Sequence, residues 1–138
     1  MWRYRDKPIR THSDLPEGTT HIVYRLTFSD SMMYFGYKTI RSERRLKPTK
    51  AQLAIRKNYK RVEWKDLPFV DYKGSSKENK DKTVVDKEIL CCTSNKRTAT
   101  YLETKLMFSF SVIENDELYT NANIGGKWFS NCMEGLIV

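Results

Sequence analysis

The sequence predicts a small mixed α/β domain, of the α+β type, in which helices flank a three-stranded and mainly antiparallel sheet. Two neighbouring segments, residues 21–28 and 32–40, alternate apolar and polar side chains as the strands of a hairpin do. Residues 84–92 form a third strand-like segment, and residues 95–113 repeat apolar side chains at helical spacing. The chain has 138 residues, which is enough for one domain with one core.

Composition suggests where this domain begins and ends. Residues 1–20 are polar and contain several turn residues, so we expect an extended lead-in there. Residues 21–130 form the predicted domain, and residues 131–138 form a tail. No apolar stretch reaches membrane-spanning length, and the first residues lack the apolar core of a signal peptide. We therefore expect a cytoplasmic protein with no membrane partner.

The charge balance points to a polyanionic partner. The chain has 25 Lys and Arg against 17 Asp and Glu, a formal net charge of +8, with a pI of about 9.4. Domains this basic commonly bind nucleic acid through phosphate contacts and counterion release, which favours nucleic acid over a basic protein without such a partner. Three cysteines, two of them adjacent, do not suit a disulfide framework, and two histidines without a Cys-x-x-Cys pair do not suit structural zinc.

The predicted hairpin carries two tyrosines, Tyr24 and Tyr34. On the first strand, alternation places on one face Ile22, Tyr24, Leu26 and Phe28. On the second strand, one face carries Met32, Tyr34, Gly36 and Lys38. Taken alone, the two tyrosines fit plain core or cross-strand packing equally well.

Residues 41–65 are strongly basic, with ten Lys or Arg against Glu43 and Glu63. Within this segment, helical spacing relates Ala51, Ala54, Ile55, Tyr59 and Val62. The spacing predicts a basic amphipathic helix over about 48–62. Such a helix is often only a solvated face, but the excess of one sign favours a surface that faces DNA.

Two further features are compatible with phosphodiester chemistry. Glycine and serines at 74–76 can offer backbone N–H groups to a phosphate, although a plain turn is the commoner reading of such a segment. Glu103 falls on the apolar face of the helix predicted over 95–113. A carboxylate there is unfavourable unless a basic side chain or a bound cation compensates it, and both alternatives stay open.

The ordered set of these residues resembles the GIY-YIG endonuclease family. The first motif reads Ile22-Val23-Tyr24 and the second Tyr34-Phe35-Gly36. Three later segments follow in the order found in phage-encoded members related to free-standing homing endonucleases: residues 72–76, 101–105 and 121–129. Ile22-Val23 replaces Gly-Ile in the first motif and Phe35 replaces Ile in the second, while both tyrosines are kept.

The resemblance implies a metal-dependent endonuclease that hydrolyses phosphodiester bonds in DNA. It implies that Tyr24 is the general base, that Tyr34 and Arg44 stabilise the phosphate, and that Asn121 orients the site. It also implies that Glu103 holds one Mg²⁺, with Mn²⁺ as the alternative ion. The family places its arginine on a helix after the second motif, where Arg41 and Arg45 are rivals of Arg44.

The same resemblance implies a set of substrate-binding residues, namely Gly36, Lys38, Arg41, Arg45, Lys73 and Ser75. The implied substrate is double-stranded DNA in the cytoplasm of a phage-infected host. Because each chain supplies one site, cutting both strands requires a homodimer or two visits. The alternative is a catalytically silent module on the same fold that binds DNA or a host factor, or a regulatory partner of a larger phage assembly.

Overall fold

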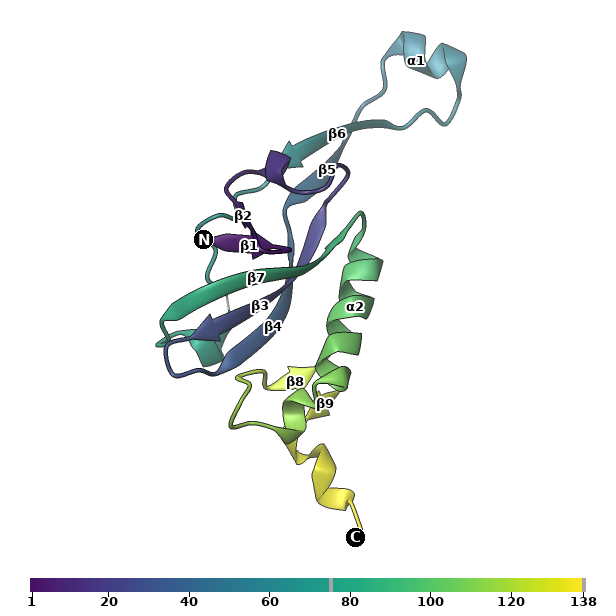
Figure 1. Ribbon diagram of the computed structural model, residues 1–138. Coiled ribbons are helices and arrows are strands. Elements are labelled where there is room, and N and C mark those ends of the chain that lie inside the picture. The colour runs from purple at the N-terminus through teal and green to yellow at the C-terminus, as the bar shows by residue number, and fades with distance from the viewer. Residues whose placement is uncertain (75, 138) are drawn as a thin grey trace.

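The computed structural model describes residues 1–74 and 76–137. Its main layer is a five-stranded sheet, and the long helix α2 (Lys96–Ser109) lies along one face of it (Figure 1). The strands follow the spatial order β2 (Lys7–Ile9), β1 (Trp2–Tyr4), β7 (Val84–Thr93), β3 (His21–Phe28) and β4 (Met33–Thr39). Within the described ranges, no helix is both long enough and apolar enough to cross a membrane.

The mixed α+β class is confirmed, and the three predicted strands are present as β3, β4 and β7. They pair antiparallel, with β3 in the middle. The predicted total of three strands is wrong, because the lead-in contributes two more strands. β1 pairs parallel to β7 and antiparallel to β2, with Trp2 opposite Lys87. This pairing joins segments far apart in the chain, so a local pattern does not reveal it.

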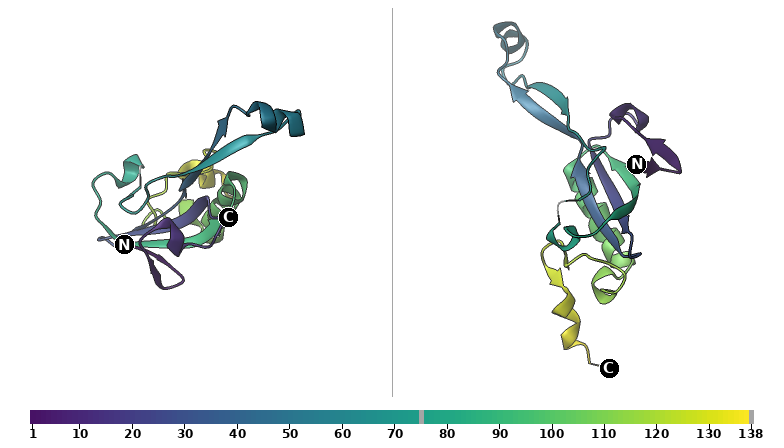
Figure 2. Two further views of the ribbon diagram at one scale, coloured as in Figure 1. Left: turned by 90° about the horizontal axis from the view of Figure 1, so that it is seen from above. Right: turned by 90° about the vertical axis from the view of Figure 1, so that its left-hand side faces the viewer.

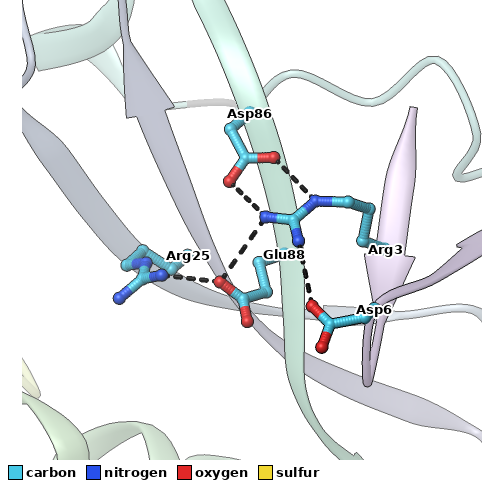
Figure 3. A network of polar contacts seen from close by, with 5 residues as sticks. All are labelled: Arg3, Asp6, Arg25, Asp86 and Glu88. Carbon is cyan, nitrogen blue, oxygen red and sulfur yellow. Dashed lines mark hydrogen bonds and ion pairs between the residues drawn. The ribbon is translucent and has the colours of Figure 1, made fainter.

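Two kinds of contact hold the lead-in on the sheet. The side chain of Trp2 is fully buried, and its indole N–H donates to the carbonyl oxygen of Phe69 at 2.9 Å. On β1 the next residue, Arg3, makes a two-pronged pair with Asp86, at 3.1 Å and 2.8 Å. Figure 3 shows that Glu88, which binds Arg25 at 2.6 Å, also lies close to Arg3. The network therefore connects β1, β7 and β3.

Side-chain alternation divides the core between the two faces of the sheet. The face away from α2 carries the cluster of Trp2, Ile9, Leu15, Ile22, Tyr24, Leu26, Phe28, Ile40, Phe69 and Ile89. The face toward α2 carries the cluster of Phe35, Met107, Val112, Ile113, Tyr119 and Ile124. The predicted common face of Ile22, Tyr24, Leu26 and Phe28 is confirmed.

The basic segment is a β-hairpin, and the predicted helix over 48–62 is wrong. Strands β5 (Arg41–Leu46) and β6 (Arg61–Asp66) pair antiparallel, and only the short helix α1 (Lys50–Ile55) forms at the tip (Figure 1). Thr49 caps α1 through its hydroxyl, which accepts from the Gln52 N–H. An amphipathic helix owes most of its stability to packing of its apolar face, and here that face is exposed, with Ile55 83% accessible.

The last part of the chain wraps the α2 side of the sheet. Asn95 caps α2 by accepting from the Thr98 N–H at 2.8 Å. The helix ends at Ser109, short of the predicted residue 113, because Ser111 adopts a left-handed conformation with φ of 51°. The remaining short elements are η1 (His12–Asp14), η2 (Lys77–Asn79), η3 (Val112–Glu114), β8 (Asn123–Ile124), β9 (Trp128–Phe129) and η4 (Ser130–Gly135).

Trp2 provides a test of whether the lead-in is part of the core. Trp2→Ala should lower the free energy of unfolding by about 3–5 kcal/mol, because it removes a fully buried ring and a hydrogen bond to Phe69. Trp64, which is 46% accessible on the hairpin, is the matched control and should lose less than about 1 kcal/mol on conversion to Ala. Urea unfolding followed by circular dichroism measures both variants. Equal losses of unfolding free energy in the two variants would contradict the conclusion that the lead-in is part of the core.

Candidate active site

Tyr24 lies at the centre of the sheet, directly opposite Gly36 on the neighbouring strand β4. Its side chain is 2% accessible, and its ring lies across β4, since a Cβ built on Gly36 would come within 2.5 Å of the tyrosine hydroxyl. The β3–β7 register also shifts between Val23 and Tyr24, so the strand is irregular at this residue. The second motif therefore needs glycine because any side chain there would displace the tyrosine hydroxyl.

The Tyr24 hydroxyl contacts a residue that the sequence did not single out, Tyr72. Tyr24 donates to the Tyr72 hydroxyl at 3.5 Å, and the two rings meet nearly at right angles with centroids 5.9 Å apart. The ammonium group of Lys38 lies 4.1 Å from the Tyr72 ring centroid, which is a cation–π contact. Tyr72 could have been identified as a site residue from the sequence, because it begins the segment 72–76 that carries part of the family resemblance. The sequence prediction named Lys73 and Ser75 from that segment instead.

Buried Lys87 holds the backbone that carries Tyr72. Its ammonium group donates to the carbonyl oxygens of Val70 and Tyr72, at 2.6 Å and 3.1 Å. Burial lowers the pKa of Lys87, and these two acceptors compensate part of the lost hydration. Lys73, the neighbour of Tyr72, is exposed, and Ser75 lies outside the described residues.

Tyr34 belongs to the same face of the sheet as Tyr24. It pairs with Leu26 across β3 and β4, two positions before Gly36, and its side chain is half-buried. Burial raises the pKa of Tyr34, the negative charge of Glu103 adds to this effect, and a hydrogen bond with the Ser76 side chain opposes it. The two motif tyrosines therefore share one surface of the sheet.

Glu103 comes from α2, which packs on the opposite face of the sheet. One of its carboxylate oxygens, Oε2, is buried and has no hydrogen-bond partner among the described residues. Burial raises the pKa of Glu103 to about 7. Its charge also raises the pKa values of Tyr24 and Tyr34, so the carboxylate lies within electrostatic reach of both hydroxyls. Because Tyr24 and α2 are on opposite faces, this interaction acts across the edge strand β4.

Burial is also the main cause of a large upward shift in the pKa of Tyr24. The hydrogen bond with Tyr72 and the negative charges of the surrounding groups add to it. Tyr24 is therefore a neutral phenol at physiological pH, and its phenolate needs a compensating positive charge.

An unpaired buried carboxylate oxygen is the kind of atom that a bound cation satisfies. Mg²⁺ prefers oxygen ligands and keeps several of its waters, so one carboxylate is an adequate protein anchor for it. Within residues 1–74 and 76–137, no group of three or more His, Cys, Asp and Glu side chains gathers as a metal cluster. Glu103 thus fits a cation held by one carboxylate, and it does not fit a cation held entirely by protein ligands.

Asn121 binds the backbone of the second motif. Its side-chain oxygen accepts from the Phe35 N–H at 3.1 Å, and its side-chain nitrogen donates to the Phe35 carbonyl oxygen at 2.9 Å. These two bonds satisfy the outward backbone groups of an edge strand, which otherwise face solvent. Asn121 therefore positions the strand between Tyr34 and Gly36.

The candidate arginines lie on the hairpin, where the expected helix is absent. Arg44 and Arg45 are exposed on β5. Arg41 makes an ion pair with Asp66, with a distance of 2.9 Å between Nε and Oδ1. The prediction that Arg44 lies on a helix is wrong, because β5 continues almost directly from β4. Lys38 is the predicted cation that lies beside the tyrosines.

These features define a small α+β domain with a tyrosine-rich site, to which a buried carboxylate contributes from the far side of the sheet. A family model described as "Putative endonuclease segE, GIY-YIG domain" matches residues 2–124. The chain belongs to this GIY-YIG family, which is a family of nucleases that act on DNA. No curated protein and no solved structure matches the chain.

The contact between Tyr24 and Gly36 yields a stability test. Gly36→Ala should lower the free energy of unfolding by about 1–3 kcal/mol, because the new Cβ overlaps the buried Tyr24 hydroxyl. Gly135→Ala is the control, since a Cβ there meets open space. Urea unfolding measures both. An unchanged stability of the Gly36 variant would contradict the close packing.

The raised pKa of Glu103 predicts that stability depends on pH. Its folded-state value of about 7 exceeds the ordinary 4.5, so the folded state binds more protons between these values. Without divalent ions, stability should therefore fall as the pH rises from 4.5 to about 7, and Glu103→Gln should remove this part of the dependence. The expected size is on the order of 2 kcal/mol, reduced by the partial exposure of the group. Urea unfolding at several pH values measures how the stability of each protein changes with pH. Curves of stability against pH that run parallel for the two proteins would contradict the raised pKa of Glu103.

Proposed function

We propose that the protein is a metal-dependent endonuclease that hydrolyses phosphodiester bonds in double-stranded DNA at the Tyr24 site. The observation that carries the proposal is one buried carboxylate oxygen of Glu103, which has no hydrogen-bond partner among the described residues and whose charge raises the pKa values of Tyr24 and Tyr34. This arrangement is unfavourable for folding alone, and a bound cation would compensate it. Membership of a DNA nuclease family supports the same conclusion.

In the proposed reaction, a water molecule attacks the phosphorus and the bond to the 3′ oxygen breaks. The products are a 5′-phosphate and a 3′-hydroxyl. Tyr24 first loses its own hydroxyl proton along its hydrogen bond to Tyr72 toward solvent, and the phenolate then accepts the proton of the attacking water. Because burial raises the pKa of Tyr24, this step requires positive charge nearby, and Lys38 supplies it from its position over the Tyr72 ring.

The other residues hold the phosphate and the strands in place. Tyr34 donates a hydrogen bond to the phosphate from the same face of the sheet. Asn121 keeps β4 in position through both bonds to Phe35. An additional phosphate contact from Arg44 remains a prediction, since it requires DNA to reach both β5 and the tyrosines.

Glu103 is the proposed ligand of Mg²⁺ or Mn²⁺. The ion, when bound, supplies positive charge that stabilises the phosphate and the leaving oxygen. Glu103 must lose its proton before it can bind a cation, and its pKa of about 7 makes this loss incomplete at neutral pH. Activity should therefore rise with pH through this range.

A second function, DNA binding without cleavage, is favoured by one observation. The side chain of Tyr24 is only 2% accessible and its hydroxyl is covered by Tyr72. A proton acceptor in this position reaches water only through Tyr72 or after Tyr72 moves. If neither happens, the fold binds DNA and leaves it intact.

A cleavage assay decides between the two functions. Labelled duplex DNA and supercoiled plasmid should be cut in Mg²⁺ or Mn²⁺ and left intact in EDTA. Tyr24→Phe and Glu103→Gln should each lower the rate by about 10²-fold or more, because each removes a group that moves a proton or holds charge at the phosphate. Tyr101→Phe on α2 and Glu114→Gln on η3, both at exposed residues, are the matched controls and should cut at the normal rate.

Circular dichroism of each variant separates loss of chemistry from loss of fold. Metal-dependent cleavage at full rate by Glu103→Ala would contradict the proposed ligand. Salt-sensitive binding without cleavage by the unaltered protein, in either metal, would favour the silent module.

A further inference from the structure

The positive charge of this protein is concentrated in one projecting element. We call residues 41–66 the basic arm, which comprises β5, α1 and β6. It carries ten Lys and Arg against Glu43, Glu63 and Asp66, a net +7 of the chain's +8. The rest of the chain is nearly balanced, with fifteen basic and fourteen acidic residues. Figures 1 and 2 show that the arm extends well beyond the sheet and α2.

The two faces of the arm differ in charge. Register pairs Arg44 with Glu63, Ser42 with Lys65 and Leu46 with Arg61, so these six residues share one face. That face carries three cations and one carboxylate, and among the described residues no ion pair involves its cations. The opposite face is balanced, with Arg41, Arg45, Glu43 and Asp66 beside Val62 and Trp64. We call the first face the cationic face.

The shape of the arm fits duplex DNA. A two-stranded antiparallel ribbon is an element that the major groove of B-DNA, about 12 Å wide, can admit. The arm presents its cations on exposed strands, and all six residues of β6 are exposed. Arg61 donates one long hydrogen bond, to the Lys47 carbonyl oxygen at 3.3 Å, and the exposed cations of such a ribbon can reach phosphates without breaking an ion pair.

The arm is also positioned relative to the tyrosine site. Only Ile40 separates β5 from β4, the strand that carries Tyr34, Gly36 and Lys38. Six residues of extended chain, from Lys38 to Arg44, span about 20 Å, which corresponds to roughly six base pairs of B-DNA. DNA bound at the tyrosines would therefore extend along the arm on one side of the cut.

We propose that the basic arm is a DNA-binding element that holds the duplex beside the cleavage site through Arg44, Arg61 and Lys65. This inference rests on the proposed function, because it takes duplex DNA as the substrate. In this arrangement the arm provides most of the affinity for DNA, and the sheet carries the residues that cut it.

The test removes two charges from the cationic face. The double variant Arg61→Gln, Lys65→Gln is compared with the double variant Lys7→Gln, Arg10→Gln, which loses the same charge from exposed positions on and just after β2, the edge strand opposite β4. Binding of a 30-base-pair duplex, a length of about three helical turns, is measured by fluorescence anisotropy in EDTA over a range of salt concentrations.

The arm variant should bind about tenfold more weakly near 0.1 M salt, and the slope of log affinity against log salt should fall by about 2. The control should change affinity by less than about twofold, since the charge around it is balanced.

Equal losses in the two double variants would overturn the proposal, because they would show an effect of net charge alone. An equal loss with single-stranded DNA or duplex RNA would overturn the assignment to duplex DNA. Because binding is measured in EDTA, a protein that binds through the arm without cutting in Mg²⁺ would retain this inference and refute the proposed function.

Discussion

The site depends on one packing constraint, the close approach of the Tyr24 hydroxyl to the backbone of Gly36. It exists because β3 and β4 pair in a register that places these residues opposite each other. A slip by one residue would turn Tyr24 toward α2 and away from Tyr34. The contacts around the pair maintain that register. Asn121 binds the outer edge of β4 at Phe35, and Lys87 fixes the backbone of the residue that covers Tyr24.

Charged side chains of this protein lie in two contrasting environments. On β1, β7 and β3, Arg3, Asp86, Glu88 and Arg25 compensate one another near the surface. At the tyrosine site, one carboxylate oxygen of Glu103 is buried without a hydrogen-bond partner in the part of the chain that the structure describes, and the charge of Glu103 opposes ionisation of both motif tyrosines. Natural proteins retain unfavourable electrostatics of this kind most often at functional sites. The contrast is the strongest physical reason to look for bound ligands at Glu103.

The separation of the basic arm from the nearly neutral sheet also has a consequence for association. A concentrated positive field attracts DNA from solution and orients it before contact, whereas a spread charge attracts it without direction. The arm continues from the motif strand, so an oriented duplex would be delivered next to Tyr34 and Lys38.

Much of the domain follows from local patterns in the sequence. Alternation identified the strands that became β3, β4 and β7, and helical spacing identified α2 and the unusual position of Glu103 on its apolar face. These elements are recognisable because each has one buried face, which the periodicity of apolar side chains records. The ordered motifs likewise indicated the family.

Three features were decided by tertiary structure. The lead-in joined the sheet because Trp2 and Arg3 find partners more than sixty residues away, at Phe69 and Asp86. Residues 41–66 became a hairpin because helical spacing is not sufficient when the apolar face has nothing to pack against, as exposed Ile55 shows. Tyr72 reached Tyr24 through a segment held by Lys87. The sequence by itself determined which short segments carry chemistry and which faces they bury. Only the folded chain decided how those segments meet, because contacts between distant residues depend on the whole packing arrangement.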